Sequence, residues 1–185
     1  MPFAYLDHAA STPMRPEAVA ALVEVLEHTP GNPSGQHRWA RDARRRLDDA
    51  RDGIASLLGI EPGGVVFTSG GTESDNLAIR GVLGAYGGRA LCSEIEHHAV
   101  LDVVHASGGG TVAVDASGRL DLEHLADELA ADPEISVVSV MLANNEVGTL
   151  QDLDAVAAAI EAARPTHPRG LVLHTDAVAA AAWVD

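Results

Sequence analysis

The sequence predicts an α/β fold in which a mainly parallel sheet is covered by helices on both faces. Short apolar runs alternate along the chain with helical stretches of ten or more residues. The apolar run over 135–143 is of the kind found in strands that are buried on both faces. Hydrophobic residues form 46% of the 185 residues, which is enough for a core, whereas aromatic residues form only 3%. Ala, Val and Leu must therefore supply most of the packing.

The N-terminal region predicts two helices. Pro16 stands at a favoured first-turn position and begins a helix that we expect to end near Glu27. Turn-forming residues fill 28–33. A strongly charged helix is expected over 36–58, because its Arg and Asp residues have spacings that allow ion pairs along a helix surface.

The rest of the chain predicts the alternating sheet. We expect strands over 64–68, 89–93, 111–114, 135–143 and 171–175. We expect helices over 73–86, 99–105, 122–131 and 152–163. Asp121 is a plausible N-cap for the third of these helices. In such a sheet, ligands bind beyond the carboxyl ends of the strands, so chemistry is expected just after each strand.

Composition excludes several classes of function. Asp and Glu number 27 against 12 Lys and Arg, giving a formal charge of −15, which argues against binding nucleic acid or an anionic membrane. All of the basic residues are Arg, so the chain alone cannot form a lysine Schiff base. Cys92 is the one cysteine, which excludes an intrachain disulfide. The absence of a long apolar run and of a signal-peptide pattern leads us to expect a cytoplasmic protein.

Two strand ends carry candidate binding residues. The segment 69–76 (SGGTESDN) places small residues between a strand and a helix, so that Gly71 and Thr72 could hold a phosphate. A tight turn is the alternative, and no Gly-Lys-Ser/Thr follows as in a P-loop. The segment 94–98 (EIEHH) could be a metal site, a solvated loop, or a loop that lays His97 over an aromatic ligand.

Two further strand ends add polar groups. Asn144 and Asn145 could donate to a ligand oxygen or simply form a turn. Asp176 leaves a buried strand, where it could pair with a protonated heterocyclic nitrogen or act as a helix N-cap. A phosphate cup, a stacking imidazole, an amide donor and a carboxylate together match pyridoxal phosphate, with no metal.

Six segments make the sequence resemble the cysteine desulfurases of the class V aminotransferases. They read YLDHAASTP, GNPSGQHRWARDARRRLDDAR, VVFTSGGTESDN, SEIEHHAV, LANNEVGTLQDL and LHTDAV. The resemblance implies the large domain of the aspartate-aminotransferase fold. It implies phosphate binding by Gly71 and Thr72, and stacking and proton transfer by His97. It also implies an amide contact from Asn145 and pairing of Asp176 with the cofactor ring nitrogen.

The resemblance also implies which parts of a family member lie outside residues 1–185. It ends at Asp185, near the midpoint of a family member, so residues 1–185 should hold an N-terminal segment and much of the large domain. The remainder of that domain, the small domain, the cofactor-binding lysine and the persulfide-forming cysteine are expected elsewhere. Cys92 is interpreted as a small core residue. Ala179 stands where the family usually has Gln, which removes one contact to the cofactor. The chain alone is therefore expected to be inactive.

Two hypotheses about function remain open. In one, the chain is half of a desulfurase that converts L-cysteine to L-alanine and passes sulfur to an acceptor protein for iron–sulfur assembly or tRNA thiolation. In the other, it is a non-catalytic remnant that serves as a binding or scaffold module, or part of another class V enzyme. In either case we expect exposed apolar surface and association as a homodimer or with a complementary C-terminal half.

Overall fold

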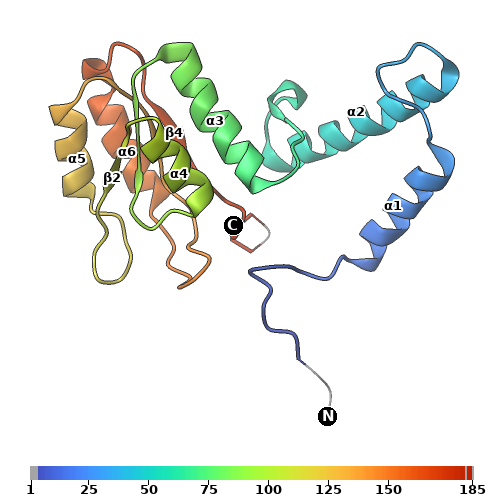
Figure 1. Cartoon of the computed structure of the whole chain (residues 1–185), viewed down its shortest axis with the longest axis horizontal. Coiled ribbons are helices and arrows are strands. Elements are labelled where there is room, and N and C mark those ends of the chain that lie inside the picture. Colours follow the sequence, from blue (N-terminus) through green and yellow to red (C-terminus); the bar gives the residue numbers. More distant parts are fainter. Residues whose placement is uncertain (1–3, 182, 185) are drawn as a thin grey trace. The chain divides into compact units, whose positions relative to one another are not determined.

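The computed structural model describes residues 4–181, 183 and 184 and is shown in Figure 1. The chain divides into two compact units, Met1–Phe67 and Thr68–Asp185. The first unit contains helices and extended segments, and the second contains the sheet. Each unit is described separately below.

Two helices form most of the first unit, as the sequence predicts. Helix α1 spans Pro16–His28, and helix α2 spans Arg38–Leu58, followed by a 3₁₀ turn at Pro62–Gly64. Helix α2 begins two residues later than predicted because the ring of His37 caps it, accepting a hydrogen bond from the Ala40 amide at 3.2 Å. It ends at Gly59, whose φ of 65° is left-handed and favours glycine.

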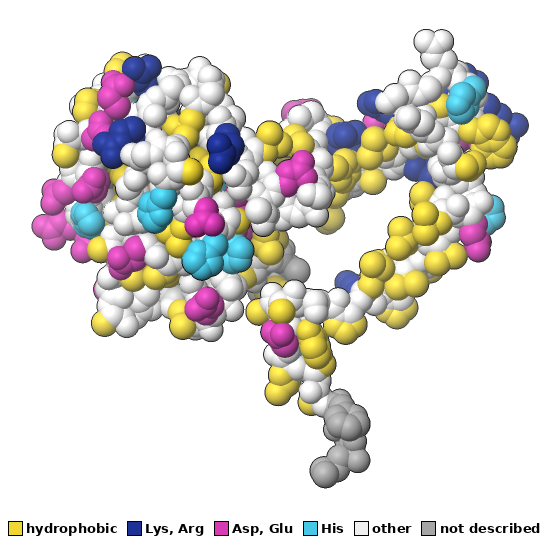
Figure 2. Space-filling model, viewed as in Figure 1, with side chains coloured by type: hydrophobic (Ala, Val, Ile, Leu, Met, Phe, Trp, Pro, Cys, Tyr) yellow, Lys and Arg dark blue, Asp and Glu magenta, His cyan; other side chains and the backbone are white. Residues whose placement is uncertain are grey.

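Exposed ion pairs, not a large apolar core, dominate this unit. Within α2, Arg44 pairs with Asp48 at 2.9 Å, and Arg46 reaches Glu24 of α1 at 2.6 Å. Such exposed pairs contribute little to stability, because water and salt screen them. Helix α1 has no buried residue, and Figure 2 shows hydrophobic side chains along it. The exposed apolar surface expected from the sequence is therefore present.

The second unit is built on four parallel strands in the order β2-β1-β3-β4. The strands are β1 (Arg89–Ser93), β2 (Gly110–Val112), β3 (Ile135–Ser139) and β4 (Val172–His174). The helices are α3 (Gly71–Tyr86), α4 (His98–Ala106), α5 (Leu122–Ala131) and α6 (Leu153–Ala163), and a 3₁₀ turn lies at Arg164–Thr166. Asp121 caps α5 as predicted, accepting from the His124 amide at 3.0 Å.

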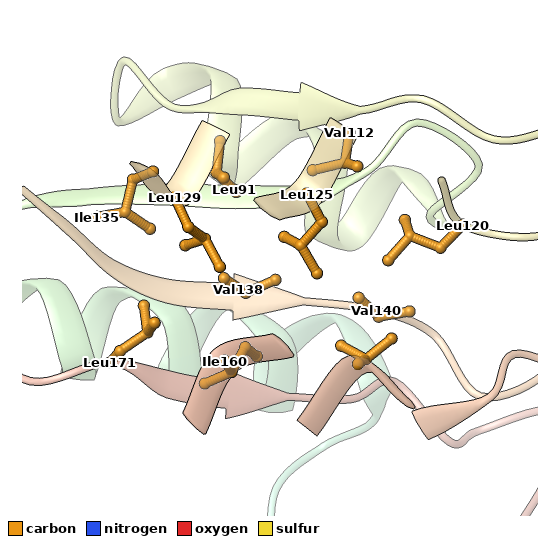
Figure 3. Packing of buried hydrophobic residues seen from close by; sticks show 11 residues of the cluster. Leu91, Val112, Leu120, Leu125, Leu129, Ile135, Val138, Val140, Ile160 and Leu171 are labelled. Carbon is orange, nitrogen blue, oxygen red and sulfur yellow. The ribbon is translucent and has the colours of Figure 1, made fainter. Parts of the chain in front are cut away.

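Helices cover both faces of this sheet. On one face, Leu125 of α5 and Ile160 of α6 pack in a cluster with Leu91, Val138 and other aliphatic residues (Figure 3). On the other face, side chains of α3 and α4 pack against alternate residues of β1. Ala90 and Cys92 face this second cluster whereas Leu91 faces the first, as the two-residue period of a strand requires. The predicted α/β fold with a mainly parallel, two-sided sheet is confirmed.

The strand predicted over 64–68 is wrong. Gly64 ends the 3₁₀ turn, and residues 65–68 belong to no ladder in the described part of the chain. Val65 has extended backbone, with φ −90° and ψ 121°. An extended segment becomes a strand only when a neighbour accepts its hydrogen bonds, and apolar composition cannot reveal whether that neighbour is present.

Strand β3 is shorter than the predicted 135–143. Beyond Ser139 the chain still follows the end of β4, with the Val140 amide donating to His174 O and the Leu142 amide donating to Asp176 O, both at 3.0 Å. An antiparallel bridge between Ala143 and Leu150 then turns the chain away. The segment that follows β3 is thereby held directly beside Asp176.

Candidate cofactor site at the carboxyl edge of the sheet

The parallel sheet brings three of the predicted site residues to one edge. His97 follows β1, Asn145 follows β3 and Asp176 follows β4. These three strands are neighbours, and their carboxyl ends lie at the same edge because they run parallel.

The first turn of α3 provides backbone donors for an anion. No side chain caps the helix at Gly70, so the amides at its start remain candidates for an external acceptor. A Cβ at Gly71 would lie 3.0 Å from Cγ2 of Val178, two residues after Asp176. The backbone at Gly71 thus lies close to the segment that follows Asp176, and a larger residue there would require the exposed Val178 side chain to shift. The hydroxyl-bearing side chain of Thr72 is exposed beside it.

The acidic side chain of Glu73, in the first turn of α3, is hydrogen-bonded to a residue that precedes the helix. The carboxylate of Glu73 accepts from the amide of Ser69 at 2.7 Å and from its hydroxyl at 2.5 Å. These hydrogen bonds lower the pKa of Glu73. Its ionised form is thus held at Ser69, where it stabilises the turn that precedes the helix.

His97 has a defined ring orientation. Its Nδ1 accepts a hydrogen bond from the Ala99 amide at 3.1 Å and caps helix α4. In a neutral imidazole, an accepting Nδ1 leaves the proton on Nε2. The cap therefore presents Nε2–H of an exposed ring as a donor, in keeping with the predicted contact with a ligand.

Asn145 and its neighbour Asn144 have different environments. Asn145 lies exposed in the turn after β3. Asn144 is buried, and its Oδ1 accepts from the amides of Glu146 and Val147, both at 2.9 Å. The turn anticipated from the two asparagines is therefore formed by Asn144, while Asn145 remains open to a ligand.

Asp176 is buried at the end of β4. Its Oδ1 accepts from the Val178 amide at 2.9 Å, within a turn that the Ala180 and Ala181 amides close onto Ala177 O. Asp176 thus caps a turn, and the described residues after it form no helix, so the structure does not show the helix N-cap considered as an alternative. A carboxylate accepts several hydrogen bonds, so this cap is compatible with a second, cationic partner.

Two further buried carboxyl groups lie near Asp176; both stand in candidate segments of the sequence, 69–76 and 94–98, but neither was expected at the cofactor. Asp75 of α3 and Glu96 of the loop after β1 are buried. Burial raises the pKa of Glu96 to about 8 and that of Asp75 to about 6, and the negative charge of Asp176 contributes to both shifts. One signal was available: Asp75 falls on the same helical face as the buried Ile79.

A half-buried histidine connects Asp75 to the sheet. His174 of β4 places Nε2 at 3.7 Å from Oδ1 of Asp75, while its Nδ1 lies 2.8 Å from the hydroxyl of Ser139 in β3. Burial lowers the pKa of His174. This contact connects helix α3, whose start is the predicted phosphate site, to strand β4, which Asp176 follows.

A shallow depression runs beside α3 and α4. Thr72 and His97 line it together with Asn76, Arg80, His98 and Asp102. Gly71, Asn145 and Asp176 do not line it. The structure thus relates the predicted residues through two features: Thr72 and His97 share the depression, and Gly71 and Asp176 share the contact through Val178.

The environment of Cys92 agrees with the core role assigned to it. The residue is fully buried in β1, and burial raises the pKa of its thiol to about 12. A thiol with that pKa is protonated at neutral pH and is a poor nucleophile.

The residues present fit pyridoxal phosphate. Amides at the α3 N-terminus suit its phosphate, and the buried Asp176 suits a protonated ring nitrogen. Near Asp176, the buried oxygens Asp75 Oδ2 and Glu96 Oε2 have no hydrogen-bond partner within the described residues. In the described residues, no group of three or more His, Cys, Asp or Glu is arranged to hold a metal ion.

The family model for aminotransferase class V matches residues 4–183. The chain belongs to the class V aminotransferase family. Curated relatives include an IscS-like cysteine desulfurase of Mycobacterium tuberculosis, 42% identical over 96% of this chain and 46% of its own length. The cysteine desulfurase IscS of Dictyoglomus turgidum is 37% identical over 94% of this chain and 44% of its own length.

Solved structures show the same family fold. A NifS-like protein superposes with a TM-score of 0.83 at 29% identity, over 92% of this chain and 47% of its own. A structure described as SspA in complex with cysteine gives a TM-score of 0.82 at 29% identity, over 95% of this chain and 51% of its own. The chain thus spans about half the length of these class V relatives. None of its described helices has the length and apolar character needed to cross a bilayer.

Proposed function

We propose that this class V chain forms part of a pyridoxal phosphate-dependent cysteine desulfurase. The observation that carries the proposal is the approach of the α3 N-terminus, through Gly71 and Val178, to the segment of the buried Asp176. That approach brings an anion site and a cation site together, as a phosphate-bearing pyridine requires. The desulfurases among its relatives support this activity over others in the family.

Each residue of the proposed site has a defined task. The amides of Gly71 and Thr72 and the Thr72 hydroxyl hold the phosphate. Asp176 keeps a proton on the ring nitrogen, and His97 covers the ring while holding a proton on Nε2. Asn145 donates its amide to a ligand oxygen. When bound, pyridoxal phosphate supplies an electron-withdrawing ring that stabilises negative charge developing on the substrate.

The overall reaction requires groups beyond these residues. L-cysteine and an acceptor thiol yield L-alanine and a persulfide, so the carbon–sulfur bond breaks and a sulfur–sulfur bond forms without an external oxidant. The chain has no Lys, and its one cysteine is buried in β1. A complementary C-terminal half would supply the amine and the acceptor thiol, and an acceptor protein for iron–sulfur assembly or tRNA thiolation would take the sulfur.

Native mass spectrometry of the protein from its own cells tests this proposal. We expect a lysine-bearing second half, joined or associated, with the mass of pyridoxal phosphate and release of alanine from L-cysteine. In that assembly, Asp176→Ala should reduce alanine formation at least about 100-fold while retaining phosphate binding, since it removes only the partner of the ring nitrogen. Unchanged turnover in this variant would remove Asp176 from the site.

The absence of Lys and the presence of Ala179 favour a second candidate. In it, the chain is a non-catalytic remnant that serves as a binding module. The same mass-spectrometric measurement separates the two, because this candidate requires a chain that carries neither the cofactor nor a lysine-bearing half.

A further inference from the structure

The loops that carry His97 and Asn145 are joined by two side chains. Each of these side chains belongs to the residue immediately before a predicted ligand contact: Glu96 precedes His97, and Asn144 precedes Asn145. Both are buried, whereas His97 and Asn145 are exposed. The buried residue of each pair is therefore placed to fix the position of its exposed neighbour.

Glu96 takes the place of a missing strand. After β3, the amides of Val140 and Leu142 point to the β4 side and donate to carbonyl groups at the end of β4 and just after it. The Met141 amide between them points to the opposite side, where β1 has already ended at Ser93. The Oε1 atom of Glu96 accepts the hydrogen bond from that amide, as a carbonyl of a longer β1 would.

Asn144 makes the reciprocal contact. Its Nδ2 donates to the carbonyl of Ile95 at 3.0 Å, in the loop that contains Glu96. Its Oδ1 meanwhile accepts from the two amides of its own turn. Asn144 thus fixes the turn that carries Asn145 and attaches it to the loop that carries His97.

We propose that Glu96 and Asn144 form a reciprocal clamp that sets the spacing of His97 and Asn145 over a bound ligand, so that both are positioning residues. This inference rests on the proposed function for the identity of the ligand. The clamp itself rests on four hydrogen bonds within the second unit, and it can be measured without a ligand.

The cost of burying Glu96 supports a specific role. A carboxyl group in this acidic environment loses hydration, and its Oε2 has no protein partner. Because Glu96 is largely protonated at neutral pH, an amide of the same shape can replace it with Oε1 kept as the acceptor for Met141. Glu96→Gln should therefore preserve the clamp, whereas Glu96→Ala should break it.

Hydrogen exchange and NMR of the whole chain test the clamp in the absence of ligand. We expect Glu96→Ala to speed exchange of the Met141 amide about tenfold, as loss of one hydrogen bond predicts, and to shift the ring resonances of His97. In Glu96→Gln, exchange should stay within about twofold of wild type. Asn144→Asp keeps Oδ1 but loses the donor to Ile95, so it should shift the His97 resonances while the amides of Glu146 and Val147 stay protected.

Glu94→Ala is the matched control. Glu94 lies in the same loop, but it accepts from the Val114 amide at 2.9 Å, on the β2 side. Its replacement should leave Met141 exchange and the His97 resonances unchanged. Equal effects of Glu94→Ala and Glu96→Ala would overturn the clamp, as would wild-type Met141 exchange in Glu96→Ala.

Ligand binding then separates the clamp from the proposed function. By equilibrium dialysis of the native assembly with pyridoxal phosphate, Glu96→Ala and Asn144→Asp should raise the dissociation constant about 3- to 10-fold, and Glu96→Gln should restore it. If wild type binds no pyridoxal phosphate, the proposed function fails while the exchange data still decide the clamp. If wild type binds and the clamp variants bind equally well, the positioning role is wrong.

Discussion

Three buried carboxyl groups lie near the carboxyl edge of the sheet, so the charge of the candidate site depends on which of them are protonated. Asp75, Glu96 and Asp176 cannot all carry a negative charge in low-dielectric surroundings without large cost. Burial and the charge of Asp176 raise the pKa values of Asp75 and Glu96. The higher of these two pKa values, about 8, belongs to Glu96, so Glu96 is largely protonated at neutral pH.

Asp75 should make the chain less stable as the pH rises. Its pKa is about 6 in the folded chain against an ordinary value of 3.8, so its stabilising contribution is full below pH 3.8 and is lost as the pH rises through 6. His174 and His97 are its basic neighbours. Asp75→Asn should raise the free energy of unfolding by about 1–2 kcal/mol at pH 8, once solvent screening is allowed for, and by little at pH 4.

Urea unfolding at these two pH values measures this difference. Asp102→Asn, an exposed substitution on α4, serves as the control and should change neither value. If the free energy of unfolding changed with pH in the same way in wild type and Asp75→Asn, the inference that ionised Asp75 destabilises the fold would be wrong.

Residue types and strand ends led to three candidates, the exposed His97 and Asn145 and the buried Asp176, but not to the buried residues beside them. His97, Asn145 and Asp176 follow successive strands of the sheet, which the alternating pattern anticipates. Whether Glu94 or Glu96 enters the interior depends on how the loop turns after Ser93. The two residues are of the same type and lie in the same loop, so the sequence does not distinguish them. Contacts between loops that are distant in sequence, such as the hydrogen bond from Asn144 to Ile95, cannot be predicted from local sequence patterns.

Two helices of the second unit, α5 and α6, begin in the same way. Asp121 and Asp152 each accept a hydrogen bond, at 3.0 Å, from the amide three residues later, and so cap α5 and α6. Each cap satisfies an amide that has no partner within its helix. These caps are readable from sequence because the acidic residue stands directly before the helical periodicity.

Loss of the Asp121 cap should destabilise the second unit by about 1 kcal/mol. Asp121→Ala removes the acceptor for the His124 amide without disturbing the apolar face of α5. Asp127→Ala, on the exposed surface of the same helix, is the control and should be neutral or slightly stabilising. The difference in urea midpoint between the two variants measures the cap, and equal midpoints would show that solvent replaces it.

At the scale of the whole molecule, apolar burial is concentrated in the second unit. In the described part of helices α1 and α2, Ala40 and Ala55 are the buried residues, whereas the sheet unit holds two aliphatic clusters. The sequence predicted these helices but not the surface that packs against them. Amphipathic spacing shows which side of a helix is apolar, but it does not show what that side contacts.

The purified chain should associate with copies of itself through the apolar face of α1. Leu22 and Leu26 are exposed on that helix, with Val19 and Val23 beside them. Light scattering should give a mass above the 19.2 kDa of one chain. Leu22→Glu with Leu26→Glu should lower that mass towards the monomer, and the exposed Glu27→Gln should not. A wild-type chain of monomer mass at all concentrations would contradict this expectation.

The parallel order of the sheet also has a consequence during synthesis on the ribosome. Strand β3 lies between β1 and β4, but β4 begins only at Val172, long after β3 ends at Ser139. At about 5–20 residues per second, roughly 2 to 7 seconds pass before the second partner is made. For that interval one edge of an Ile- and Val-rich strand stays unpaired on the nascent chain, which is the form that invites aggregation and chaperone capture.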